Sequence, residues 1–217
     1  ARQMAELNDA HMIFKVGLID FERQLTNNIE NKNKVVNLGA GITPIAGSCS
    51  HHHHHHHHAH GVDPHIWTSP RALKVMVGNV RDAVMRIYPD STKYDEASIR
   101  LMARIDSLDN YCAERIAAAD VDVMMIYHPA YTYYAQDYGI EQIAIEQDGK
   151  EPSPKQLTTL IGKARDNNIE HIFIQPQYNK DKVRTIANEC NADIVTTNPL
   201  DKDILSEIRR ITDIICE

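Results

Sequence analysis

After residue 120, short apolar segments alternate regularly with longer amphipathic ones. This alternation constrains the fold more than any other feature, because neighbouring parallel strands need a crossover helix between them. The helix-stop pair Tyr138-Gly139 and the helix-start pair Ser153-Pro154 mark two of the boundaries. The pattern predicts a parallel sheet covered by helices, with right-handed crossovers. The expected strands are 121–127, 142–145, 171–174 and 193–196, and the expected helices are 130–138, 154–167, 181–190 and 201–215.

The first half of the chain predicts fewer strands and one unusually long helix. A helix from about residue 70 to 88 ends at Pro89-Asp90, and Ser91 caps a second helix that reaches about residue 119 and would be roughly 40 Å long. That length favours a helix joining two lobes, although one long packing helix in a single domain is the alternative. We therefore expect an incomplete N-terminal lobe, a linking helix and a C-terminal lobe, with boundaries 1–90, 91–119 and 120–217. Within the first lobe, helices are expected at 3–9 and 20–29, and strands at 11–16 and 35–38.

Composition narrows the class of partner. The formal net charge of −7 argues against nucleic acid, which needs a basic face. No apolar run approaches the ~20 residues of a membrane span. The chain opens without an initiator methionine or a signal, so we expect it to begin inside a domain, with any targeting signal upstream. Four cysteines lack metal-binding spacing, and a disulfide between Cys190 and Cys216 would suit an oxidising compartment.

A long segment without regular period, about 42–68, contains a run of histidines. Loops of this length in compact domains are usually functional or disordered. A purification tag is the bland alternative, but such tags sit at termini and this run is internal. We interpret the run as a flexible metal collector. Its histidines are His51, His52, His53, His54, His55, His56, His57, His58 and His60.

A different kind of histidine follows the run. His65 stands on an Asp-Pro turn just before a Ser-Pro helix start, which favours a fixed position. His128 follows the strand at 121–127, and the other three strands are followed by Glu146, Gln175 and Asn198. Because ligands of open parallel sheets bind outside the carboxyl ends of the strands, these residues are expected at one edge.

His65 and His128 would then face each other across the cleft between the lobes, where small ligands often bind. Neutral imidazole suits Zn²⁺, but two ligands are too few for tight binding. The third is expected from upstream of Ala1, while His60, Asn198, Glu146 and Gln175 are candidate ligands or supporting residues. For Asn198, Glu146 and Gln175 we favour a supporting role over direct binding of the metal. The alternatives are a turn histidine at 65 and a strand-end histidine at 128 that bind no metal. His11 and His171 begin predicted strands, so they are expected at the wrong end of the sheet.

Several motifs together resemble the periplasmic zinc-binding proteins of ABC importers, the zinc/manganese class of substrate-binding proteins. The resemblance covers essentially the whole chain. The matching segments are Asp-Pro-His-Ile-Trp at 63–67 after a histidine-rich loop, Phe-Lys-Val-Gly-Leu at 14–18, Tyr-His-Pro-Ala-Tyr at 127–131, Glu-Pro-Ser-Pro at 151–154 and Gln-Pro-Gln-Tyr at 175–178.

This resemblance implies two α/β lobes joined by one long helix, with the metal between them. It also implies that His65 and His128 are the second and third metal ligands, and that histidine rather than glutamate at 128 favours Zn²⁺ over Mn²⁺. Two departures matter. The family's first histidine ligand lies upstream of Ala1, and Asn198 stands where the family often has aspartate, which leaves a fourth protein ligand in doubt.

The expected function is therefore capture of Zn²⁺ by a monomer that is periplasmic, or extracytoplasmic and anchored to a membrane. The protein would deliver the ion to an ABC permease and would have no enzymatic activity. One alternative is a zinc-dependent hydrolase with Glu146 as general base, although the sequence contains no HExxH motif. The other is a histidine-rich storage or chaperone protein that has only weak, equivalent sites.

Overall fold

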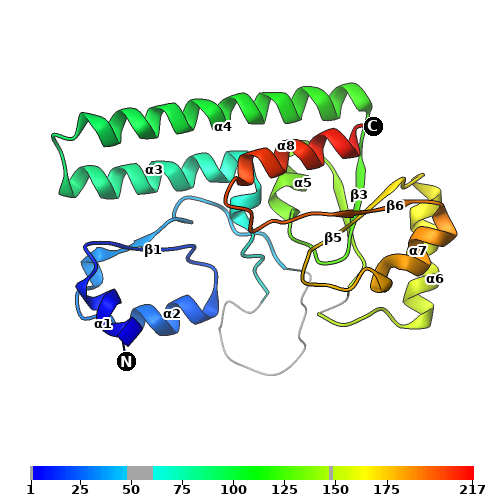
Figure 1. Ribbon diagram of the computed structural model, residues 1–217, viewed down its shortest axis with the longest axis horizontal. Coiled ribbons are helices and arrows are strands. Elements are labelled where there is room, and N and C mark those ends of the chain that lie inside the picture. The colour runs from blue at the N-terminus through cyan, green and yellow to red at the C-terminus, as the bar shows by residue number, and fades with distance from the viewer. Residues whose placement is uncertain (1, 48–60, 147–148) are drawn as a thin grey trace.

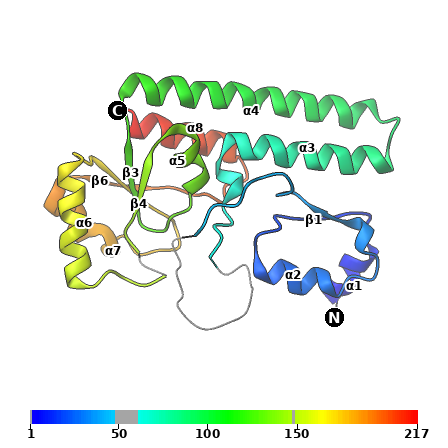
Figure 2. The same cartoon turned by 180° about the vertical axis from the view of Figure 1, so that it is seen from behind.

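The C-terminal half contains the expected four-stranded parallel sheet, in the strand order β4-β3-β5-β6. The computed structural model describes residues 2–47, 61–146 and 149–217. Side chains alternate between the two faces of the sheet, so that Met124 and Ile126 pack against α4, α5 and α8, whereas Met125 and Tyr127 pack against α6 and α7. Figures 1 and 2 show these helices on the two faces. The elements are β3 (Val123–Ile126), α5 (Thr132–Tyr138), β4 (Glu141–Ala144), α6 (Pro154–Asp166), β5 (His171–Ile174), α7 (Asp181–Cys190), β6 (Asp193–Thr196) and α8 (Ile204–Ile215).

The first half forms a smaller α/β unit in which β1 pairs in parallel with β2. A separate apolar cluster around Ile66 and Met76 joins this unit to α3 and to Tyr133 of α5. The α/β fold with parallel sheets is therefore confirmed in both halves. The elements are α1 (Arg2–Asp9), β1 (Ile13–Lys15), α2 (Asp20–Asn27), β2 (Val35–Asn37), α3 (Pro70–Ile87) and the 3-10 turns η1 (Lys32–Lys34) and η2 (Ile66–Thr68).

The long helix α4 (Thr92–Ala119) has 28 residues and runs beside both α3 and α8, as both views show (Figures 1 and 2). Three ion pairs at partly exposed positions connect it to α3: Arg71–Asp109 at 3.1 Å, Lys74–Asp106 at 2.6 Å and Arg81–Asp95 at 2.6 Å. On its other side, Cys112 and Ile116 enter the core with Ile208 and Ile211 of α8. The helix therefore packs against both halves of the molecule. No helix within the described ranges is both long and apolar enough to span a bilayer.

The disulfide between Cys190 and Cys216, which the sequence left open, is not formed in the described part of the chain. In the described part of the chain, Cys112, Cys190 and Cys216 are free thiols. Cys216 packs in the cluster on the α8 side of the sheet, whereas Cys190 packs in the cluster on the α6 and α7 side. The sheet therefore separates the two sulfur atoms.

Candidate metal site

His65 is held on a turn by the residue two positions before it. One carboxylate oxygen of Asp63 accepts hydrogen bonds from the backbone N–H of His65 at 2.8 Å and from its ring Nδ1 at 2.7 Å. Burial by itself would raise the pKa of Asp63, but the hydrogen bonds and the charge of His65 outweigh it, so the pKa is lowered. Asp63 thus stays ionised at neutral pH and directs Nε2 of His65 outward.

His128 is held in a similar way at the carboxyl end of β3. Its Nδ1 donates to the buried carboxylate of Glu146, which follows β4, at 2.6 Å. The side chain of Gln175, which follows β5, bonds both backbone groups of His128: its amide nitrogen donates to the carbonyl at 2.7 Å, and its oxygen lies 3.4 Å from the N–H. Three neighbouring strand ends therefore fix one imidazole.

The two imidazole rings lie side by side. Their centroids are 5.2 Å apart and the rings meet edge to face at 74°. Both side chains are partly accessible, 17% for His65 and 30% for His128. Because each Nδ1 is bonded to a carboxylate, each Nε2 is left to bind a cation, an arrangement common around metal-bound histidines. Trp67 and Tyr178 form the surrounding walls, with ring centroids 5.3 Å from His65 and 6.2 Å from His128.

The remaining candidates divide into supporting and unplaced residues. Glu146 and Gln175 contact His128 as described above. The side-chain oxygen of Asn198 accepts from the backbone N–H of Leu200 at 3.2 Å, and the backbone N–H of Asn198 donates to Glu207 at 2.9 Å. Across the described ranges, no group of three or more His, Cys, Asp or Glu side chains could hold a metal. His60 and the run His51–His58 lie outside the described residues.

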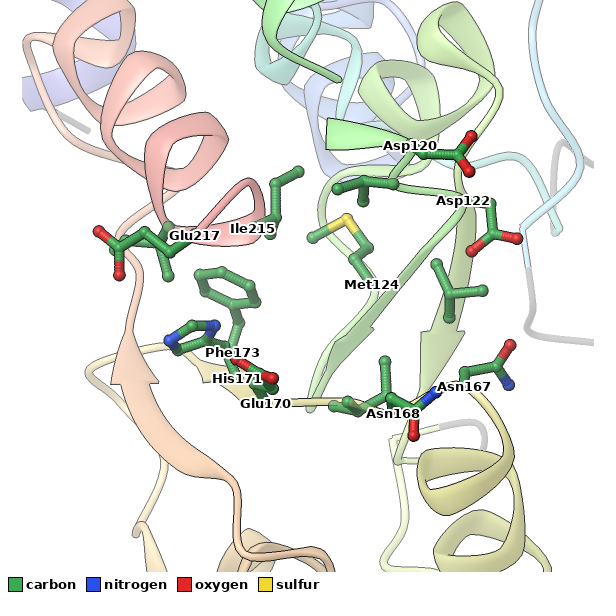
Figure 3. A pocket seen from close by; sticks show the side chains of 14 residues that line it. Asp120, Asp122, Met124, Asn167, Asn168, Glu170, His171, Phe173, Ile215 and Glu217 are labelled. Atoms are coloured by element: carbon green, nitrogen blue, oxygen red, sulfur yellow. The ribbon is translucent and has the colours of Figure 1, made fainter. Parts of the chain in front are cut away.

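The histidines expected at the wrong end of the sheet do lie there. His171 is the first residue of β5, and it lines a pocket of about 240 Å³ at the amino ends of β3 and β5 with Asp122 and Glu170 (Figure 3). His11 is exposed before β1. Neither is part of the His65–His128 pair.

Sequence reasoning missed two kinds of contact around the pair. Asp63 was interpreted only as a turn former, although a carboxylate two residues before a histidine is also placed to bond its ring. Nothing in the sequence places Tyr133 at the site, yet its hydroxyl donates to the carbonyl of Asp63 at 2.7 Å. No local pattern distinguishes that tyrosine from its neighbours Tyr131 and Tyr134, which bond Thr197 and Thr212.

The ends of the histidine-rich segment meet beside this site. Ala46 and Val62 form an antiparallel bridge, and the backbone N–H of Asp63 donates to the carbonyl of Ile45 at 2.9 Å. The backbone N–H of Ile45 in turn donates to the hydroxyl of Tyr133 at 3.1 Å. Both ends of the segment are thus bonded to Asp63 or its neighbour Val62, next to His65.

Comparison with known proteins gives a family match over nearly the whole chain. Residues 1–210 match the family described as ZnuA, zinc-uptake complex component A, periplasmic. The zinc-binding lipoprotein AdcA of Streptococcus pneumoniae (strain ATCC BAA-255 / R6) is 31% identical over 146 residues, which are 65% of this chain and 29% of AdcA. A putative metal-binding protein of Chlamydia muridarum (strain MoPn / Nigg) is 25% identical over 210 residues, which are 95% of this chain and 73% of that protein. The chain thus spans less than a third of the length of AdcA.

Solved structures agree with the sequence match. A crystal structure of ZnuA superposes with a TM-score of 0.84 at 26% identity and covers 99% of this chain and 82% of that one. A zinc-bound ZnuA that lacks residues 138–173 of its own chain gives a TM-score of 0.83 at 26% identity, covering 99% of this chain and 81% of that one. These structures share the two-lobe α/β fold. The chain therefore belongs to the ZnuA family, the periplasmic component A of zinc-uptake complexes.

Proposed function

We propose that this chain captures Zn²⁺ in the periplasm, or at an extracytoplasmic membrane anchor, and delivers it as a monomer to an ABC permease for zinc uptake. The observation that carries the proposal is the adjacent pair His65 and His128, each with Nδ1 bonded to a buried carboxylate. Neutral imidazole is a preferred zinc ligand, and a carboxylate behind it increases its basicity. The names of the similar proteins, zinc-binding AdcA and zinc-bound ZnuA, support the same cargo.

Zinc is favoured over manganese by the donor atoms. Both central groups are nitrogen donors, and Mn²⁺ prefers oxygen ligands. The carboxylates of Asp63 and Glu146 are engaged with the imidazoles at 2.7 and 2.6 Å, so they act behind the ligands. We propose that further ligands come from outside the described residues or from water. In this scheme the lobes are residues 1–90 and 120–217, and the helix 91–119 links them.

We also propose that the chain has no catalytic role. A zinc hydrolase would need a general base free to activate water. The best candidate for that base, Glu146, is buried and already accepts the hydrogen bond of His128. Turnover of ester or phosphoester substrates that depends on both zinc and Glu146 would contradict this part of the proposal.

The test is a competition titration of metal-free protein against a chromogenic zinc chelator. His65→Ala and His128→Ala should each weaken the tightest site by more than the about 10- to 100-fold typical of losing a residue behind a ligand. His171→Ala, at the opposite edge of the sheet, is the matched control and should leave the affinity unchanged. If both site variants keep the wild-type affinity, the assignment is wrong.

The histidine-rich loop is proposed to supply additional, weaker sites that raise the local zinc concentration. Replacing all nine loop histidines by serine should lower the number of bound zinc ions and preserve the tight site. If every site is weak and all of them vanish with the loop, a storage or chaperone protein is the better description.

A further inference from the structure

The turn that carries His65 is bonded directly to the segment that carries His128. Thr68, three residues after His65, is fully buried. Its hydroxyl oxygen lies 2.8 Å from the carbonyl oxygen of His65 and 2.9 Å from that of Ala130, two residues after His128. A hydroxyl has a single proton, which here is shared between two carbonyl groups, one from each histidine-bearing segment.

A second side chain makes a parallel connection. Tyr133 is 5% exposed and belongs to α5, which starts four residues after His128. Its hydroxyl donates to the carbonyl of Asp63 and accepts from the backbone N–H of Ile45. Asp63 is the residue whose carboxylate holds the ring of His65. Tyr133 therefore connects the helix after one histidine to the carboxylate that orients the other.

The same interface continues along the next turn of the chain. Ser69 donates to the carboxylate of Asp137 in α5, and Arg71 donates to the backbone carbonyl of Asp137 at 3.0 Å. In addition, the indole of Trp67 donates to the carbonyl of Pro199 at 2.7 Å. Polar groups from four positions on residues 67–71 thus meet the C-terminal half of the molecule. These bonds join the turn that carries His65 to the half of the molecule that carries His128.

From this geometry we propose that Thr68 and Tyr133 are positioning residues that hold His65 and His128 as a preassembled pair before any metal arrives. The inference rests on the proposed function in that the pair serves as a zinc site. Preassembly removes the cost of ordering one ligand against the other when the cation binds. Neither residue touches the cation. Each acts through the backbone of a histidine-bearing turn.

The experiment measures the pair without relying on any third protein ligand. Cu²⁺ chelated by iminodiacetate has coordination positions left for two imidazoles, which suit this ion. Its affinity is measured by electron paramagnetic resonance titration of the full chain with the nine loop histidines replaced by serine. Loss of either histidine, by His65→Ala or His128→Ala, should abolish bidentate capture. Thr68→Val and Tyr133→Phe should each weaken it about 3- to 10-fold, the range expected when one hydrogen-bonded connection between the two histidine-bearing segments is lost.

Two controls separate positioning from general loss of stability. Thr68→Ser keeps the hydroxyl and should restore the affinity. Thr212→Val removes another fully buried threonine hydroxyl, which donates to the carbonyl of Ile208 at 2.8 Å within α8 and contacts neither histidine-bearing turn, and should lower the melting temperature without weakening the copper complex.

The proposal is overturned if Thr68→Val and Tyr133→Phe both bind the chelate as tightly as the parent, or if Thr212→Val weakens binding equally. It is also overturned if the parent binds no better than His65→Ala. Because the copper probe reports the pair itself, a failed zinc titration would refute the proposed function and leave this result standing.

Discussion

Glu146→Gln isolates what the carboxylate behind His128 contributes. The glutamine is nearly isosteric and its oxygen can still accept from Nδ1, so the change removes mainly the negative charge. Glu146 has only 6% of its side chain exposed, and it lies 2.6 Å from Nδ1 of His128. A buried charge at this distance is poorly screened and stabilises the imidazole when its other nitrogen donates electrons to a cation.

The expected magnitude follows from two independent scales. Residues placed behind metal ligands typically contribute about 10- to 100-fold in affinity. That ratio corresponds to about 1.4–2.7 kcal/mol. A hydrogen bond to a charged group contributes about 1.5–3 kcal/mol, which is the same range. We therefore expect Glu146→Gln to weaken the tight zinc site by one to two orders of magnitude.

The assay is the chelator competition titration, performed on protein whose loop histidines are replaced by serine. Glu141→Gln is the control, because Glu141 begins β4, the strand that Glu146 follows, and its side chain is 64% exposed. Wild-type affinity in Glu146→Gln, with the fold intact by circular dichroism, would refute the reasoning that this carboxylate supports a metal-binding imidazole.

Three further outcomes are expected. Gln175→Leu removes the side chain that bonds both backbone groups of His128. It should lower the free energy of unfolding in urea by about 1–3 kcal/mol and also weaken zinc binding. An unchanged urea midpoint would contradict this expectation. Burial alone would raise the pKa of Glu207, but hydrogen bonds from Arg210, Asn198 and Thr197 outweigh it and lower the pKa. The Glu207 carboxylate therefore stabilises the fold fully above pH 4.5, and this stabilisation is lost as the pH falls through the lowered pKa of the folded state. The stability difference between wild type and Glu207→Gln should therefore be about 1–2 kcal/mol at pH 7 and shrink below pH 4.5, whereas a difference independent of pH would argue against the assignment. Trp67 is the single tryptophan and its ring lies 5.3 Å from His65, so its fluorescence should change with one equivalent of zinc, and this response should be absent in His65→Ala.

Most of the C-terminal sheet was predictable from the sequence. The bounds of β5, α7 and β6 match the expected ones because each apolar run there ends at turn-forming residues. The strand predicted at 121–127 is shorter in the structure, Val123–Ile126. The apolar residues Val121 and Tyr127 extend the apolar run at either end, but they lie outside the segment that pairs with β4 and β5. The helix predicted from residue 201 begins instead at Ile204, because Asp203 caps it by accepting from the backbone N–H of Ser206.

The site was predictable only in part. The Asp-Pro turn at His65 and the strand end at His128 indicated two fixed imidazoles, and they lie together as expected. The bonds between the two histidine-bearing segments depend on which of several hydroxyl groups faces which carbonyl group across the interface, and periodicity carries no such information. The pairing of Cys190 and Cys216 stayed open for the same reason, since spacing along the chain does not specify which face of the sheet a residue occupies.

The central claim, that His65 and His128 bind one zinc ion together, is tested most directly by anomalous diffraction at the zinc edge. The crystals would contain protein with the loop histidines replaced by serine and one equivalent of zinc. The account predicts one dominant peak at about 2.0–2.1 Å from Nε2 of both histidines. Zinc bound only elsewhere, with no density between these two nitrogen atoms, would contradict it.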